Sequence, residues 1–400
     1  MSKVVKFGGS SLASAEQFEK VGKIIRADKD RRFVVPSAPG KRDAKDTKVT
    51  DMLYGCYALA EEGKDFKAEL KAIKERYQGI IDGLKLDLSL EEEFKIVEKN
   101  FKENGEFDSE KTNEILSARL KDCKSAVVPG FYGAYEDGRV KTFSRGGSDI
   151  TGSIVARAIK ADVYENWTDV SGFLLADPRI IENPVAIETI TYRELRELSY
   201  MGFSVLHEDA IFPVRREGIP INIRNTNAPE DNGTWIVGST CQKSKYVITG
   251  IAGKKGFCSI NIEKDMMNSE IGFGRKVLQA FEDNGISFEH VPSGIDTMTV
   301  FVHQDEFMHK EQQVVSALHR LANPDAIDIE ADLALIAVVG RGMKSMRGTA
   351  GRIFSALAHS NVNVKMIDQG SSELNIIIGV TNADFEVAIK AIYDFFVETV

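Results

Sequence analysis

The stretch Lys6-Phe7-Gly8-Gly9-Ser10-Ser11 decides the fold of this chain. The apolar run Val4–Phe7 predicts a buried strand, and the glycine pair that follows predicts a turn. Apolar positions then recur with helical spacing from Ser14 to Arg26, with Ser14 as the expected N-cap, and Arg32–Pro36 predicts a second strand. Strand, glycine turn, helix and strand make a βαβ unit, which indicates a parallel sheet with helices on its faces.

The length of 400 residues suffices for several domains, since one domain takes ~100–200 residues. The charged fraction of 28% and the hydrophobic fraction of 43% are typical of a soluble globular protein. Acidic residues outnumber basic ones by 60 to 51, and the net charge of −9 predicts no binding to nucleic acid or to an anionic membrane. An anionic ligand must therefore be met by a local cationic site.

The cysteines at positions 56, 123, 241 and 258 lack the CxxC spacing of a metal or redox site. The N-terminus lacks the apolar core of a secretion signal, and no stretch approaches the ~18 apolar residues of a membrane span. We therefore expect a protein of the reducing cytoplasm that has no membrane partner.

Residues 1–240 are expected to form the first domain. Glu/Lys-rich helical periodicity from about 51 to 120 predicts a helical insertion in the sheet. Sheet signals resume at 126–130 and 140–143, followed by a predicted helix over 150–160 and strands over 162–168 and 219–223. The segment Asn225–Gly233, rich in Asn, Pro and Gly, is the best candidate for the domain boundary.

The last third of the chain contains an internal repeat with an offset of 76 residues. At this offset Val277 pairs with Ile353 and Phe281 with Leu357, apolar with apolar. Each copy has a strand, a glycine-containing turn, an amphipathic helix and an alternating strand. The pattern predicts two ferredoxin-like α+β repeats, over 246–325 and 330–400, behind an α/β domain.

Two glycine turns carry the candidate chemistry. Lys6 precedes Gly8-Gly9, and Arg145 precedes Gly146-Gly147, with Ser148-Asp149 at the start of the next helix. Glycines let backbone N–H groups approach a phosphate, and Lys and Arg supply the charge that it needs. Each turn alone could be structural, and Asp149 could simply cap its helix. Together, on strands of one sheet, they indicate a ligand site at the carboxyl ends of the strands.

A polar connection follows a predicted strand at Trp167–Gly172 and continues through Ala176–Arg179. It suits a ribose, a base or phosphates, although a long capped loop would look the same. No Walker A, GxGxxG, HExxH, GxSxG, HRD or DFG sequence occurs, and the six histidines are scattered without ligand spacing. The sequence therefore argues against hydrolases, zinc enzymes and protein kinases.

Four segments together resemble the amino-acid kinase family, and specifically the aspartate kinases: KFGGSS at 6–11, FSRGGSD at 143–149, WTDVSGFLLADPR at 167–179 and PINIRNT at 220–226. The C-terminal repeat resembles the paired ACT domains that follow the catalytic domain in that family. The resemblance covers nearly the whole chain. It implies a mostly parallel sheet sandwiched by helices, followed by two ACT domains.

The resemblance implies transfer of the γ-phosphoryl of ATP, with Mg²⁺ bound through the nucleotide, to the side-chain carboxylate of L-aspartate. The product would be 4-phospho-L-aspartate, on the way to lysine, threonine and methionine. Such a transfer needs positioning and charge neutralisation rather than a covalent nucleophile. By similarity, Lys6 with Gly8, Gly9 and Ser10 would hold the transferring phosphate, and Asp149 would organise Lys6, metal or substrate ammonium.

The resemblance also implies an anchor for each end of aspartate. Arg145 would bind the α-carboxylate and Glu114 the α-ammonium, although Asn113 stands where the family usually has a glycine. The substrate pocket would further be lined by Ser37, Thr50 and Ser148. The positions that match nucleotide contacts are Thr168, Asp169, Leu174 and Arg179, with Leu174 in place of a frequent tyrosine and Ser204 in place of a frequent lysine nearby.

Relatives that lysine inhibits bind this effector in the first ACT domain, and the matching positions here are Met267, Phe273, Gly274, Ser287, Phe288 and Glu289. The resemblance therefore implies feedback by lysine, threonine or both, and a homodimer that pairs its ACT domains and can assemble further into a dimer of dimers. Two alternatives stay open from the sequence. One is a catalytically silent amino-acid sensor, suggested by Leu174 and Ser204; the other is a kinase for a different amino acid.

Overall fold

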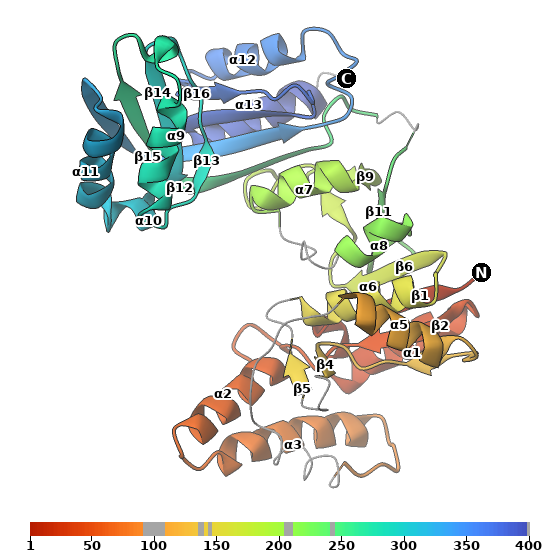
Figure 1. The fold of residues 1–400 in the computed structure, drawn as a ribbon. Helices are drawn as coiled ribbons and strands as arrows, with labels where there is room; N and C mark the ends of the chain where they lie inside the picture. Colours follow the sequence, from red (N-terminus) through yellow and green to blue (C-terminus); the bar gives the residue numbers. More distant parts are fainter. Residues whose placement is uncertain (91–108, 135–139, 143–145, 204–210, 241–244, 398–400) are drawn as a thin grey trace. The chain divides into compact units, whose positions relative to one another are not determined.

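The computed structural model describes residues 1–90, 109–134, 140–142, 146–203, 211–240 and 245–397 (Figure 1). The chain forms two compact units. The first contains Met1–Phe173, Ala186–Arg193 and Ser204–Cys241, and the second contains Leu174–Val185, Glu194–Phe203 and Gln242–Val400. Two short segments from the middle of the sequence thus belong to the second unit. The limits 1–240, 246–325 and 330–400 stay predictions.

The first unit is built on a seven-stranded sheet whose order is β3-β2-β1-β6-β10-β11-β9. Its strands are β1 (Lys3–Phe7), β2 (Arg31–Pro36), β3 (Ala126–Val127), β6 (Val163–Thr168), β9 (Thr189–Thr191), β10 (Ile221–Asn225) and β11 (Thr234–Val237). The strands β3, β2, β1, β6 and β10 run parallel, and only the pair β10–β11 is antiparallel within this sheet. The predicted mostly parallel sheet is confirmed.

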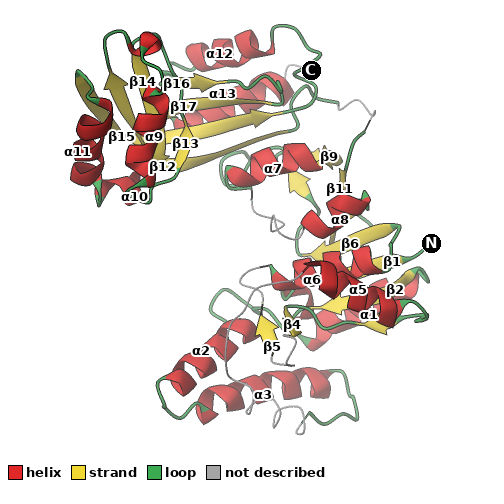
Figure 2. Cartoon of the chain, in the orientation of Figure 1, coloured by secondary structure: helices red, strands yellow, loops and turns green. Residues whose placement is uncertain are grey.

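Helices cover both faces of this sheet (Figure 2). On one face, Phe7 and Trp167 pack against Val21 and Ile24 of α1 (Ala15–Ala27). On the other face, Tyr164 lies against α6 (Gly147–Ala158). The Ser14 side chain accepts a hydrogen bond from the Gln17 backbone N–H at 3.4 Å, which confirms the expected N-cap of α1.

The helical insertion contains α2 (Val49–Glu61), α3 (Lys67–Gly83) and α5 (Ser109–Leu120). The remaining described elements of this part of the chain are η1 (Ser10–Leu12), the strand pair β4 (Tyr132–Ala134) and β5 (Val140–Thr142), the pair β7 (Phe173–Leu174) and β8 (Ala186–Ile187), α7 (Tyr192–Tyr200) and α8 (Phe212–Glu217). None of the described helices is long and apolar enough to cross a membrane.

One sequence expectation differs from the structure. The residues 140–142 pair with β4 in a separate two-stranded sheet and do not join the main one, because β4 lies antiparallel beside them. The segment Asn225–Gly233 is the connection between β10 and β11 of one sheet, and the first compact unit ends shortly after it, at Cys241. The Asn, Pro and Gly content of this segment reflects a tight reversal of the chain.

The second unit is built on a six-stranded antiparallel sheet in the order β13-β14-β12-β15-β17-β16. Its elements are β12 (Gly250–Glu263), η3 (Met267–Ser269), α9 (Phe273–Glu282), β13 (Phe288–His290), β14 (Thr297–His303), α10 (Gln304–Met308), α11 (Glu311–Ala322), β15 (Ala326–Val339), α12 (Thr349–His359), β16 (Met366–Asp368), β17 (Asn375–Thr381) and α13 (Phe385–Val397). The glycines that precede α9 and α12, Gly272 and Gly348, have φ of 83° and 81°, at the offset that the sequence repeat predicts.

The two repeats exchange strands. The second half of β12 pairs with β14 and begins the first repeat, whereas its first half, Gly250–Lys255, pairs only with the second half of β15. The second half of β15 in turn pairs with β17 and begins the second repeat. The register of β12 shifts at Gly256, whose φ is 93°. Each repeat therefore completes its four strands with half of a strand from the other.

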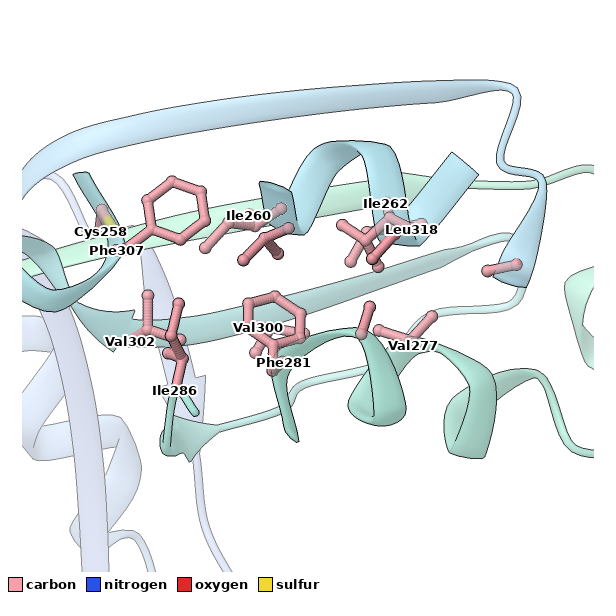
Figure 3. Packing of buried hydrophobic residues seen from close by; sticks show 14 of the residues in the cluster. Cys258, Ile260, Ile262, Val277, Phe281, Ile286, Val300, Val302, Phe307 and Leu318 are labelled. Carbon is pink, nitrogen blue, oxygen red and sulfur yellow. The ribbon is translucent and has the colours of Figure 1, made fainter. Parts of the chain in front are cut away.

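The core of the first repeat lies between the sheet and the helices α9 and α11 (Figure 3). The fully buried side chains Ile260 and Val300 come from neighbouring strands, and Phe281 and Leu318 come from the two helices. Together they bury one apolar face of the sheet, which is the main source of stability for such a unit.

We expect Phe281→Ala to lower the free energy of unfolding by about 3–5 kcal/mol, because Phe281 is 1% exposed and its removal leaves a cavity. The matched control Phe288→Ala removes the same ring from a side chain that is 48% exposed, and should cost far less. Urea unfolding monitored by circular dichroism would compare the two variants. Equal losses would contradict the described core.

Candidate functional site

The candidate site lies at the carboxyl edge of the parallel strands of the first unit, where β1 ends at Phe7 and β6 ends at Thr168. Ligands of open α/β sheets bind at this edge. Lys6 stands one residue before the end of β1 and faces Asn166 of β6 in the parallel register. The strand order thus places a cation and an amide side by side.

Lys6 is held by a buried ion pair. Its Nζ lies 2.5 Å from Oδ1 of Asp149, and the Lys6 side chain is 7% exposed. Asn166 donates from Nδ2 to the same carboxylate oxygen at 2.9 Å, and its own Oδ1 lies 3.4 Å from Lys6 Nζ. A charge taken out of water is costly unless it is paired and hydrogen-bonded, and these contacts supply both.

Asp149 is positioned by the helix that carries it. It lies in the first turn of α6, where a carboxylate is favoured by the N-terminal end of the helix dipole. The hydroxyl of Tyr164 donates to the Asp149 carbonyl at 3.1 Å, and burial, with the charge of Asp149 nearby, holds the pKa of Tyr164 well above its usual value. Gly152 lets the helix approach, since a Cβ there would lie 2.6 Å from the Tyr164 hydroxyl oxygen.

The turn Gly8-Gly9-Ser10 follows Lys6 directly. The Gly8 N–H donates to the Trp167 carbonyl at 3.0 Å, which ties the turn to the end of β6. Among the described residues, the backbone N–H groups of Gly9 and Ser10 have no acceptor, and nothing bulkier than hydrogen stands on the two glycines. Free N–H groups beside a buried ammonium are suited to bind an anion.

Gly40 packs directly against this turn. Its N–H donates to the Gly9 carbonyl at 2.8 Å, and a Cβ on Gly40 would lie 2.5 Å from the Gly9 carbonyl carbon. On the neighbouring strand, Ser37 follows the end of β2 and donates its N–H to the Phe7 carbonyl at 3.0 Å. Gly130 lies between Pro36 and Ser148, because a Cβ there would be 3.0 Å and 2.9 Å from their atoms.

The structure therefore brings together most of the predicted phosphate and catalytic residues, with two of the predicted substrate residues at the same edge. They are Lys6, Gly8, Gly9, Ser10, Ser37, Ser148 and Asp149. Thr168 and Asp169 follow the end of β6, and Thr168 donates its hydroxyl to Asp169 at 3.1 Å. They share this edge with the glycine turn.

Among the described residues, no hydrogen bond or ion pair joins the other predicted residues to this cluster. Thr50 is the second residue of α2, and Glu114 is an exposed residue of α5. Leu174 and Arg179 belong to the second unit, where Arg179 pairs with Asp177 at 2.6 Å. Arg145 and Ser204 lie outside the described residues, so the expected carboxylate anchor stays a prediction.

The predicted effector residues gather in the first repeat. Met267 and Phe273 belong to its buried core, and Gly274 is the second residue of α9. Ser287 and Phe288 are exposed. The side chain of Glu289 in β13 is 8% exposed and lies 3.2 Å from Nε2 of His303, and burial together with the Glu289 carboxylate raises the pKa of Tyr200 to about 12. Glu289 is thus a partnered carboxylate rather than a free one.

Three contributors to the site escape sequence reasoning. Asn166 follows Glu165 inside the buried strand β6 and could have been noticed as a polar residue opposite Lys6 in a parallel pair. Gly40 and Gly130 have no signal, since their roles depend on the approach of segments distant in sequence. No group of three or more His, Cys, Asp or Glu residues that could hold a metal occurs among the residues that the structure describes.

Comparison with known proteins agrees with the fold of both units. The model of the amino acid kinase family matches residues 1–225, and that of the ACT domain matches residues 336–396. Aspartokinase 3 of Bacillus subtilis is 42% identical over 98% of this chain and 98% of its own length. Aspartokinase 2 of the same organism is 27% identical over 98% of this chain and 97% of its own length.

Solved structures show the same fold. An aspartate kinase of Clostridium acetobutylicum, described as an allosteric enzyme, is 47% identical with a TM-score of 0.91, and the match covers 98% of this chain and 100% of the other. Aspartokinase III of Escherichia coli in complex with aspartate and ADP is 22% identical with a TM-score of 0.74, and the match covers 99% of both chains.

We expect Gly40→Ala to destabilise the protein by about 1–3 kcal/mol, because the added methyl group meets the Gly9 backbone and one of the two segments must move. The matched control is Gly55→Ala in the middle of α2, where nothing lies within 4 Å. That change should stabilise by about 0.5–1 kcal/mol, since alanine favours the helix. Thermal unfolding checks both signs, and a stabilised Gly40→Ala protein would refute the described contact.

Proposed function

The chain belongs to the aspartate kinases of the amino-acid kinase family, which are ATP-dependent enzymes that phosphorylate aspartate, and we propose that it transfers the γ-phosphoryl of ATP to the side-chain carboxylate of L-aspartate. The product would be 4-phospho-L-aspartate, the first intermediate towards lysine, threonine and methionine, made in the cytoplasm. The observation that carries this proposal is the buried Lys6–Asp149 pair beside the Gly8-Gly9 turn.

In the proposed mechanism the protein positions two anions and offsets their charge. The Lys6 ammonium and the N–H groups of Gly9 and Ser10 would bind oxygens of the transferring phosphoryl group, whose negative charge must be neutralised for a carboxylate to attack it. Asp149 and Asn166 hold Lys6 by 2.5 and 3.4 Å contacts, so no reorganisation is needed when the phosphate arrives. No covalent intermediate on the protein is required.

Aspartate would lie between this cation and the residues of the neighbouring edge. We propose that Ser37, Thr50 and Ser148 line its pocket, that Glu114 binds its ammonium, and that Arg145 binds its α-carboxylate. Ser37 and Ser148 support this, because both lie at the edge where Lys6 points. Thr168, Asp169, Leu174 and Arg179 are proposed for the nucleotide.

The residues present fit a magnesium ion that arrives with the nucleotide. Mg²⁺ keeps several waters and binds one or two carboxylates together with phosphate oxygens, rather than a cage of protein ligands. Oδ2 of Asp149 has no partner among the described residues and would be the carboxylate oxygen available to it. The ion would supply charge neutralisation on the β- and γ-phosphates.

We expect Lys6→Met to lower kcat/KM by about 10²–10³-fold, since it removes a charge aimed at the transferred group but little volume. Asp149→Asn should also impair turnover, because it leaves the Lys6 ammonium buried without a counter-ion. Lys20→Met, on the exposed face of α1, is the matched control and should retain wild-type rates. Trapping the acyl phosphate as a hydroxamate measures all three.

The same assay distinguishes the alternatives. Full turnover by the Lys6→Met protein would remove Lys6 from the mechanism. Absence of any ATP- and aspartate-dependent product from the wild-type protein would favour a silent sensor, and a product from glutamate instead of aspartate would favour another amino-acid kinase.

We further propose that lysine, threonine or both inhibit the enzyme by binding in the first ACT repeat, which would pair with that of a second subunit in a homodimer. An effector ammonium needs a carboxylate, and Glu289 is buried enough to make such a pair strong. It already interacts with His303 and Tyr200, so an effector ammonium would compete with them for this carboxylate. Tyr200 is the last residue of α7, so an effector that displaces Tyr200 would also move the end of this helix.

We expect Glu289→Gln to raise the half-inhibitory effector concentration by about tenfold or more, because it removes the charged partner of the ammonium. Tyr200→Phe should lower that concentration, since it removes a competitor for the same carboxylate. Glu282→Gln, an exposed carboxylate at the end of α9, is the matched control and should leave inhibition unchanged. Titrating activity with lysine and threonine tests these outcomes; unaltered inhibition in Glu289→Gln would exclude this site.

A further inference from the structure

A buried arginine of the helical insertion reaches the glycine turn through the intervening loop. Arg76 lies on α3, is 7% exposed, and donates from Nη2 to the carbonyl oxygen of Gly40. Its Nη1 donates to Oδ2 of Asp46 at 2.7 Å. One planar guanidinium therefore binds both ends of the loop from Gly40 to Asp46.

The loop is closed further by Arg42. This side chain donates to Asp46 from Nε at 2.9 Å and from Nη2 at 3.0 Å, and its backbone N–H donates to Asp46 at 2.8 Å. Arg42 and then Arg76 hold the pKa of the Asp46 carboxyl well below its usual range, so Asp46 stays charged. Arg42 is 56% exposed, however, and only Arg76 reaches Gly40.

A buried ion pair is weak evidence that a guanidinium is present for stability, because a well-packed apolar side chain often stabilises a fold as much. The apolar cluster of α2 and α3, which includes Val49, Cys56, Leu70 and Ile73, could be extended by an apolar side chain at position 76. What an apolar residue could not do is hold two acceptors in one plane at fixed separation. Arg76 therefore fixes the position of the Gly40 carbonyl relative to the Asp46 carboxylate.

Gly40 connects Arg76 to the glycine turn. Its N–H binds the Gly9 carbonyl at 2.8 Å, and the two backbones touch without any side chain between them. Arg76, Gly40 and Gly9 thus form a continuous chain of contacts from α3 to the turn that we propose as the phosphate site.

We propose that Arg76 is a positioning residue for phosphoryl transfer, which sets the place of the Gly8-Gly9-Ser10 turn through the carbonyl of Gly40. The proposal rests on the proposed function of that turn as the phosphate site. Arg76 touches neither substrate nor nucleotide and acts only through Gly40.

The test compares Arg76→Lys, Arg76→Met and the matched control Arg42→Met in the full-length protein. Arg76→Lys keeps the charge but loses the planar fork that holds both acceptors at a fixed separation, so it should retain the fold while weakening ADP binding and lowering kcat/KM by about 10- to 100-fold. Arg42→Met removes a contact to the same Asp46 and should leave ADP affinity within twofold. Hydrogen exchange should quicken at the Gly40 amide in both Arg76 variants and not in Arg42→Met.

Chemical rescue separates positioning from a loss of stability. Added guanidinium ion should restore part of the activity of Arg76→Ala but none of the activity of Lys6→Met. Wild-type ADP affinity and kcat/KM in Arg76→Lys and Arg76→Met would overturn the proposal. It would also be overturned if Arg42→Met lost ADP affinity and activity to the same extent as the Arg76 variants for an equal drop in melting temperature. If Lys6→Met itself binds ADP and turns over normally, the phosphate site is wrong; if only the Arg76 variants behave as wild type, the positioning role alone fails.

Discussion

The contact on which the first unit depends is the ion pair between Lys6 Nζ and Asp149 Oδ1, at 2.5 Å in a place that water hardly reaches. A buried ammonium without a partner would destabilise the fold by several kcal/mol, roughly the size of the whole net stability of a domain. The pair forms only when β1, β6 and α6 are all in place. The geometry of the site and the folding of the unit are thus one requirement.

The strand β6 serves both faces of the sheet because successive side chains point in opposite directions. On the α6 face, Asn166 contacts Lys6 and Asp149. On the α1 face, the buried Glu165 accepts from Arg31 Nε and Trp167 Nε1 at 2.8 and 2.9 Å. Hydrogen bonds to charged groups therefore anchor the strand on both sides, which fixes the position of Asn166 beside Lys6.

In the second unit, a different buried carboxylate joins several elements through hydrogen bonds. Glu194 of α7 is fully buried, and it accepts from the Thr249 hydroxyl at 2.6 Å and from Nη1 of Arg341 at 2.9 Å. Glu197 accepts from Asn375 at 2.6 Å, and the Glu289 carboxylate contributes, after burial, to the raised pKa of Tyr200. Contacts along α7 thus reach both repeats, and α7 from Glu194 onwards belongs to the unit that carries the proposed effector site.

The sequence alone determined the elements that depend on neighbouring residues: the βαβ opening, the Ser14 cap, the two glycine turns and the repeat offset of 76, since periodicity and turn chemistry act over a few positions. Its motifs also indicated Lys6 and Asp149 as candidate site residues, although only the structure shows that the two side chains form an ion pair. Only the tertiary structure decided that Asn166 joins them, that β12 and β15 are shared between the repeats, and that Arg76 reaches Gly40 from 36 residues away. Such contacts depend on how distant segments pack and on which buried charges must be satisfied, and no local pattern encodes either.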